Sequence, residues 1–214
     1  MTKDSETWYR RDNGIYFKQG NHQKSPKNRA QYHAKLFREW SSIDSFLNKN
    51  SALPLRKALD IGCGYGRLTP WINTISEKTF AIDHDSEALG KAKKQYPEIE
   101  FRNERIQETS FEDSEFDLLF AWNVLMHIPE VEIKDAINEM KRILSEEGHV
   151  LIMENIQEQP ESPVTWGRTV EKYESLFKLP LQDEEFGPVA ETYQYSKRSK
   201  FRASDNKMML FKNQ

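Results

Sequence analysis

The chain has 214 residues, of which 37% are hydrophobic and 30% are charged, and its formal net charge is −3. This length fits one large domain with a full core, and the near-neutral balance gives no reason to expect nucleic acid as a partner. A single cysteine excludes an internal disulfide, and without a membrane-length apolar run or a signal peptide we expect a cytoplasmic protein with no membrane partner.

The first predicted element is an amphipathic helix that begins near Ala30. Its apolar residues recur at steps of three and four: Tyr32, Leu36, Trp40, Ile43 and Leu47. Residues 1–56 hold eleven basic and five acidic side chains, which fits either a solvated helix face or a lid that attracts an anionic substrate. We expect residues 1–52 to form a helical N-terminal cap and residues 53–214 to form the main domain.

From residue 56 onward, strand-like and helix-like segments alternate. Strands are expected at 56–61, 78–83, 99–104, 116–122 and 149–155. Helices are expected at 67–75, 86–96, 131–148 and 170–177. Two further strand-like stretches in residues 191–213 fit an antiparallel hairpin. This order predicts an α/β fold with a mostly parallel sheet of seven strands and helices on both faces.

Three glycines stand at alternate positions between the first strand and the helix that follows it: Gly62, Gly64 and Gly66. Without side chains, the backbone there can turn sharply and approach a ligand closely, and the start of a helix adds N–H donors. Ligands of parallel sheets bind beyond the carboxyl ends of the strands, next to the first strand. The spacing differs from the G-x-G-x-x-G of dinucleotide sites, although a nicotinamide enzyme stays an alternative.

The string ALDIGCGYGRLT, which begins at Ala58, resembles motif I of the class I S-adenosylmethionine-dependent methyltransferases. Three later segments resemble the following motifs of that family in the right order: FAIDHDSEAL, SFEDSEFDLLFAWNVLMHIPE and INEMKRILSEEGHVLIMEN. The resemblance covers residues 55–156. It implies a Rossmann-like methyltransferase sheet and S-adenosyl-L-methionine as the cofactor.

The resemblance implies cofactor-binding roles at the ends of the first two strands. Asp83, with His84 beside it, ends the second strand, where a carboxylate can accept both ribose hydroxyls. The alternative for Asp83 is a helix cap. Asp60 is expected to hold the methionine end of the cofactor, or else to stabilise the turn, and the three glycines are expected to pass under the cofactor.

One position departs from the family pattern. An acid after the third strand commonly takes the adenine amino group, but Arg105 stands there, and a guanidinium cannot accept a hydrogen bond. We expect Ile106 and Gln107 to hold the adenine instead, with Glu104 and a surface role for Gln107 as alternatives. Trp122, at the end of the fourth strand, is expected either to face the positive sulfonium through a cation–π contact or to belong to the core.

Two residues are candidates for a general base. His127 lies just past the fourth strand and Glu154 at the tip of the fifth, and the alternatives are a structural histidine and a loop cap. No metal site is expected. Nothing in the sequence specifies an oligomeric state.

The acceptor site is expected to come from segments outside the common core. These are residues 1–28, the loop at 155–170 with Trp166 and Arg168, and the tail hairpin, although their aromatic residues also fit a core role. Aromatic side chains beside basic ones suit a small polar or anionic substrate, methylated at oxygen. The alternatives are a methyltransferase that acts on RNA or protein, and an inactive module that only binds the cofactor.

Overall fold

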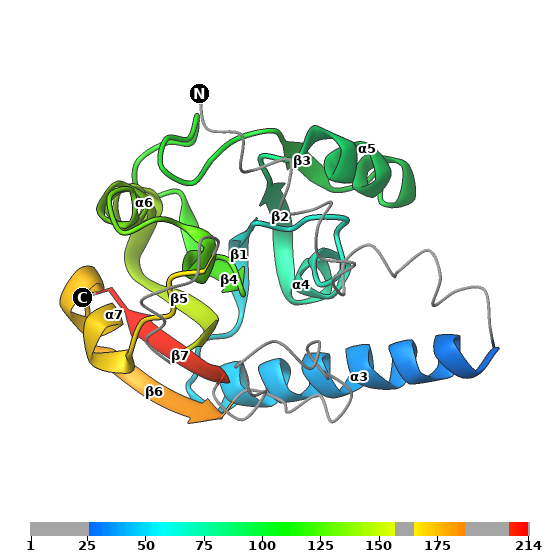
Figure 1. Cartoon of the computed structure of the whole chain (residues 1–214), viewed down its shortest axis with the longest axis horizontal. Coiled ribbons are helices and arrows are strands. Elements are labelled where there is room, and N and C mark those ends of the chain that lie inside the picture. Colours follow the sequence, from blue (N-terminus) through cyan, green and yellow to red (C-terminus); the bar gives the residue numbers. More distant parts are fainter. Residues whose placement is uncertain (1–25, 157–164, 187–205, 214) are drawn as a thin grey trace. The chain divides into compact units, whose positions relative to one another are not determined.

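The computed structural model describes residues 26–156, 165–186 and 206–213 (Figure 1). The chain divides into two compact units, residues 1–43 and 44–214. The predicted first helix is α3 (Pro26–Lys49). The predicted division between residues 52 and 53 stays a prediction, and among the described residues no helix is long and apolar enough to cross a bilayer.

The elements after α3 alternate between strands and helices as predicted. In chain order they are β1 (Leu55–Ile61), α4 (Thr69–Ile75), β2 (Ser76–Ile82), α5 (Ser86–Gln95), β3 (Glu100–Arg102), β4 (Phe116–Trp122), η1 (Leu125–His127), α6 (Ile133–Ile143), β5 (Leu144–Asn155), α7 (Val170–Phe177), β6 (Leu181–Phe186) and β7 (Asn206–Lys212). Helix α5 begins where the Asp85 side chain accepts hydrogen bonds from two amides of the first turn.

Seven strands form one sheet in the order β3-β2-β1-β4-β5-β7-β6. The pairs from β3 to β5 are parallel, whereas β7 runs antiparallel to both β5 and β6. Figure 1 shows β1 in cyan, with β2 on one side and the green β4 on the other. The prediction of a mostly parallel sheet with a C-terminal antiparallel hairpin is confirmed, and its topological switch point lies between β1 and β4.

Helices cover both faces of this sheet. The larger hydrophobic cluster joins Leu59 and Ile61 of β1 to residues of α6 and α7. The smaller cluster joins Ala81 of β2 and Phe101 of β3 to residues of α5. Because neighbouring residues of a strand point to opposite faces, a central strand between two such layers must be apolar throughout.

Two element boundaries differ from the predicted ones. Helix α6 ends at Ile143, and residues 144–148 belong to β5, with a register shift where β5 pairs with β4. In the hairpin, β7 lies inside the predicted tail, but its partner β6 lies at Leu181–Phe186, before the predicted range. The sequence does not predict β6 because the strand contains three acidic residues, and acidic side chains are depleted in strands.

Candidate functional site

The glycine loop lies at the carboxyl end of β1, beside the end of β2. Ile61 and Ile82 are register partners at the ends of these strands. The amides of Gly62 and Cys63 both donate to the Ile82 carbonyl, at 2.8 and 3.1 Å. The loop therefore turns directly over the end of β2, which is where parallel sheets of this topology bind their ligands.

Asp83 follows β2 and is 4% exposed. Its Oδ2 accepts a 2.8 Å hydrogen bond from the Gly64 amide, and its Oδ1 accepts one of 2.8 Å from the Asp85 amide. His84 Nδ1 lies 3.4 Å from the same Oδ1. Burial raises the pKa of Asp83, and the backbone donors oppose that rise. A carboxylate has about four acceptor sites, so further hydroxyl donors fit on this side chain.

Asp60 is the second buried carboxylate at this edge and is 3% exposed. Thr69, at the start of α4, donates its hydroxyl to Asp60 Oδ2 at 2.6 Å. Burial raises the pKa of Asp60 to about 7, and the negative charge of Asp83 acts in the same direction. Two buried carboxylates therefore lie at this edge of the sheet, at the ends of β1 and β2.

The three glycines have different neighbours, although all have positive φ angles. A Cβ atom at Gly62 would lie 2.5 Å from Val124 Cγ2, and one at Gly66 would lie 3.3 Å from the Tyr96 ring. A Cβ atom at Gly64 would meet no atom of the described residues within 4 Å. Gly62 and Gly66 therefore allow close internal packing, whereas Gly64 leaves bare backbone facing open space.

These residues fit S-adenosylmethionine. Open backbone at Gly64 allows close approach of a ligand, and the Asp83 carboxylate beside it can accept hydroxyl donors. Burial raises the pKa of both Asp60 and Asp83, and a nearby positive charge favours the ionised form of a buried carboxyl group. S-adenosylmethionine carries ribose hydroxyls that can donate to a carboxylate, and its ammonium and sulfonium groups are positively charged.

A family model described as "Methyltransferase domain" matches residues 58–148. This range contains the end of β1, the glycine loop, Asp83 and strands β2 to β4. The matched range is less than half of the chain, and it is similar to a methyltransferase domain. Together with the relatives and solved structures described next, this match supports the predicted class I S-adenosylmethionine-dependent methyltransferase fold and its cofactor.

The similarity to individual methyltransferases is distant. A Mycobacterium tuberculosis relative named "Probable S-adenosylmethionine-dependent methyltransferase MT3114" is 24% identical over 97 residues, which are 45% of this chain and 35% of the relative. The chain spans half or less of the length of the curated relatives it matches.

Solved structures share the fold of this protein over most of the chain. The N-methyltransferase NodS of Bradyrhizobium japonicum, in complex with S-adenosyl-L-homocysteine, has a TM-score of 0.59 and 18% identity, and the match covers 89% of each chain. The [4+2]-cyclase SpnF has a TM-score of 0.60 and 16% identity over 74% of each chain. At such identities the likeness shows the fold alone.

The predicted adenine residues of the methyltransferase domain are engaged in internal contacts. Ile106 is 5% exposed and belongs to the larger hydrophobic cluster. Gln107 Nε2 and Arg105 Nη2 both donate to Glu132 Oε2, at 2.8 and 2.9 Å. Glu104 accepts hydrogen bonds from the Ser110 amide and hydroxyl. Adenine contacts by Ile106 and Gln107 therefore stay a prediction.

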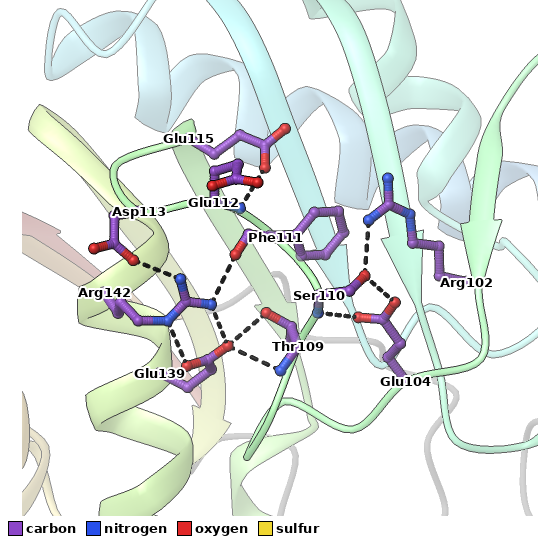
Figure 2. Close-up of polar contacts among 10 residues, drawn as sticks. All are labelled: Arg102, Glu104, Thr109, Ser110, Phe111, Glu112, Asp113, Glu115, Glu139 and Arg142. Atoms are coloured by element: carbon purple, nitrogen blue, oxygen red, sulfur yellow. Dashed lines mark hydrogen bonds and ion pairs between the residues drawn. The ribbon is translucent and has the colours of Figure 1, made fainter.

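The loop between β3 and β4 is tied to α6 through Glu139 and Arg142. Figure 2 shows the Arg142 guanidinium between Glu139 and Asp113, and Thr109 against the same Glu139 carboxylate. Glu139 Oε1 accepts from the Thr109 amide at 2.9 Å and from its hydroxyl at 2.6 Å. Hydrogen bonds from Arg142 come first among the causes that lower the pKa of Glu139 to about 2.

Replacing Glu139 by glutamine is expected to lower the free energy of unfolding by about 1–3 kcal/mol at pH 7, because charged hydrogen bonds are lost. Because folding lowers the pKa of Glu139 from 4.5 to about 2, its stabilising effect is present above pH 4.5 and disappears as the pH falls towards 2. Urea unfolding at several pH values measures this difference.

The matched control is Glu132→Gln, since Glu132 accepts two hydrogen bonds but its side chain is 40% exposed. Its free energy of unfolding is expected to change by less than about 1 kcal/mol. Equal effects of the two substitutions, or a Glu139→Gln effect that persists unchanged towards pH 2, would contradict the assignment.

Trp122 is 6% exposed and stacks on Phe120, with ring centroids 5.7 Å apart. These contacts are those of a core residue. A contact between Trp122 and the sulfonium stays a prediction.

The candidate bases occupy different environments. His127 lies at the end of η1 and is partly exposed. Glu154 is fully buried, and its carboxylate accepts hydrogen bonds from the amides of Val124, Leu125 and Met126, at 2.9, 2.8 and 3.0 Å. The structure thus gives Glu154 the geometry of a loop cap, which was the alternative to a general base.

Arg168, one of the acceptor-site residues expected from the sequence, is engaged in internal contacts. It is 3% exposed and donates hydrogen bonds to the carbonyls of Leu125 and Ile128. These contacts are structural, and a role of Arg168 at an acceptor site stays a prediction. Most of the other predicted acceptor segments, residues 1–25, 157–164 and 187–205, lie outside the described residues.

Two supporting residues were missed. Thr69 holds the Asp60 carboxylate, and Asn103 Nδ2 donates to the Asp83 carbonyl at 2.8 Å. Thr69 ends the string that resembles motif I, so its position at the start of the following helix was a usable signal. Asn103 had no comparable signal, because its contact depends on how β3 lies against β2.

Proposed function

We propose that this chain transfers the methyl group of S-adenosylmethionine to an oxygen of a small polar or anionic molecule. The observation that carries the proposal is the bare Gly64 backbone beside the buried Asp83 carboxylate. Methyltransferase is the family's activity, and the family model covers this part of the chain.

In such a reaction the protein binds the cofactor and the acceptor, orients them, and removes a proton from the acceptor. When bound, S-adenosylmethionine supplies a methyl group that its sulfonium has already activated. Gly64 offers backbone contact, Asp83 accepts hydroxyl donors, and Asp60 adds negative charge. Orientation of the two reactants supplies much of the rate enhancement.

The acceptor class is supported by sequence alone. In the sequence, residues 1–28 combine aromatic side chains with basic ones, and Trp166 adds a further aromatic side chain. This combination suits a planar or polar molecule with negative charge. An oxygen acceptor loses its proton during attack, and a base within reach assists that loss.

We assign the base to His127, which lies past the end of β4 on the same edge as the glycine loop. His127→Ala is expected to leave the dissociation constant of S-adenosylhomocysteine within about threefold and to lower kcat about 100- to 10,000-fold. In wild type, kcat is expected to rise with pH through the range of histidine, and this rise is expected to vanish in the variant. An unchanged pH profile of kcat would contradict the assignment.

The proposed activity is tested with S-adenosylmethionine labelled at the methyl group. The purified chain is incubated with the low-mass fraction of a cell extract and, separately, with its RNA and protein fractions. Label in the low-mass fraction, on an oxygen by mass spectrometry, supports the proposal. Label in RNA or protein contradicts the small acceptor, and binding of S-adenosylhomocysteine without transfer to any fraction contradicts the activity.

A further inference from the structure

The turn after β4 carries His127 and is held on its amide side by one buried carboxylate. Glu154 Oε1 accepts from the amides of Val124 and Leu125, and its Oε2 accepts from that of Met126. These amides are the free donors at the start of η1, where the partial positive charge of a helical turn lies. A carboxylate at this place satisfies all three donors.

The same turn is held on its carbonyl side by one buried guanidinium. Arg168 Nη1 donates to the Leu125 carbonyl at 2.9 Å, and Nη2 donates to the Ile128 carbonyl at 2.7 Å. The Trp166 amide adds a 2.6 Å hydrogen bond to the Met126 carbonyl. A planar guanidinium can reach two carbonyls at once, which a lysine ammonium cannot do in the same geometry.

Burying the side chains of Glu154 and Arg168 has a desolvation cost. Glu154 is 0% exposed and Arg168 is 3% exposed, so both have lost their hydration. Burial raises the pKa of Glu154 to about 7, while the three amide donors and the charge of Arg168 act in the opposite direction. Removing Glu154 leaves three backbone amides without their acceptor, and removing Arg168 leaves two backbone carbonyls without their donor. In either case the remaining buried side chain loses the opposite charge near it.

The turn also contacts the glycine loop. Val124 lies in the turn, and its Cγ2 would be only 2.5 Å from a Cβ atom at Gly62. Asn123, just before it, has a φ of 57° and donates its amide to the Met153 carbonyl of β5. The position of the turn is therefore fixed relative to both the glycine loop and β5.

We propose that Glu154 and Arg168 are a pair of positioning residues that hold the turn 123–128 from its two sides and so set the place of the His127 imidazole. The pair acts through backbone. The effect of Glu154 and Arg168 on methyl transfer rests on the proposed function of His127. Their effect on the position of the turn does not depend on that function.

Two variants test the pair, and one serves as the control. Glu154→Gln keeps the size of the side chain but can accept from fewer of the three amides, because its NH2 group is a donor. Arg168→Lys keeps the charge but loses the two-carbonyl geometry. The control Glu130→Gln changes a half-exposed partner of Arg168 Nε and leaves both carbonyl contacts in place.

The readouts separate the turn from the reaction. Amide hydrogen exchange at residues 124–126 and the ring resonances of His127 report on the turn without any ligand. The chain has five histidines, and the His127 signals are assigned by their absence in His127→Asn. Steady-state kinetics gives kcat and KM, and calorimetry gives the affinity for S-adenosylhomocysteine.

Both variants are expected to exchange the three amides at least about tenfold faster and to shift the His127 resonances, whereas Glu130→Gln matches wild type. The expected loss of kcat is about 100-fold, with the affinity for S-adenosylhomocysteine changed less than about threefold. If one variant fails to fold, the other decides the result.

If a folded variant shows wild-type amide exchange rates at residues 124–126 and wild-type His127 resonances, the pair does not hold the turn. If the exchange rates and resonances change but kcat does not, the pair has no positioning role in the reaction. A wild-type chain that transfers no methyl group refutes the proposed function instead, and the exchange and resonance data still decide whether the pair holds the turn.

Discussion

Replacing Asp83 by alanine is expected to weaken binding of S-adenosylhomocysteine about 5- to 150-fold, which corresponds to about 1–3 kcal/mol. The carboxylate is buried, accepts the Gly64 amide and has acceptor capacity left for the ribose hydroxyls. Its removal costs the hydroxyl contacts and also frees the Gly64 amide that shapes the loop. Isothermal titration calorimetry measures the change.

The matched control is Asp85→Ala, which removes a carboxylate two residues away. Asp85 accepts from the amides of Glu87 and Ala88 at the start of α5, so its loss is expected to cost about 1 kcal/mol of folding stability. Its effect on the affinity for S-adenosylhomocysteine is expected to be less than about twofold. Equal affinities of the Asp83→Ala and Asp85→Ala variants would contradict the role assigned to Asp83.

Replacing Gly64 by alanine is expected to leave a folded protein whose affinity for S-adenosylhomocysteine falls about 100-fold or more. Within the part of the chain that the structure describes, the added methyl group meets no atom within 4 Å, so it occupies the space that we assign to the cofactor. Because φ is 55° at Gly64, the substitution also costs about 1–2 kcal/mol of folding stability. Calorimetry and urea unfolding separate the two effects.

Gly90→Ala provides the comparison, since a Cβ atom there also meets nothing within 4 Å. Gly90 lies in α5, where alanine is the better helix former by about 1 kcal/mol. This variant is expected to be at least as stable as wild type and to bind S-adenosylhomocysteine equally well. Wild-type affinity in Gly64→Ala would exclude Gly64 from the binding surface.

The sheet could be predicted from the sequence because its central strands are apolar runs that end in recognisable signals. The glycine loop follows β1 directly, and Asp85 opens α5 as a side-chain cap. Such signals are local, so they survive without knowledge of the fold. Strand β6 has no local signal of this kind, since its pairing with β7 comes from a distant part of the chain.

The candidate site was predictable only where a residue's role depends on its own strand. Asp60, Asp83 and the glycines lie at strand ends, and the parallel sheet brings them together. The roles of Glu154 and Arg168 depend on a turn contributed by a different segment. Charged residues are rarely fully buried, so a sequence gives surface roles the higher expectation.

Arg105 illustrates a departure that the structure partly explains. It stands where the family commonly has an acid, and its guanidinium pairs with Glu132 at the start of α6. Gln107 donates to the same carboxylate oxygen, so both side chains bind the loop to α6. The sequence identified the departure, but the partner became visible only in the fold.

The central claim is that S-adenosylmethionine binds across the carboxyl ends of β1 and β2. Titration of the 15N-labelled chain with S-adenosylhomocysteine, followed through the backbone amide resonances, tests it most directly. The predicted result is a saturable shift that is largest at Gly62, Gly64 and Asp83 and small in β6 and β7. Absence of any saturable shift, or shifts confined to residues away from these two strand ends, would contradict the claim.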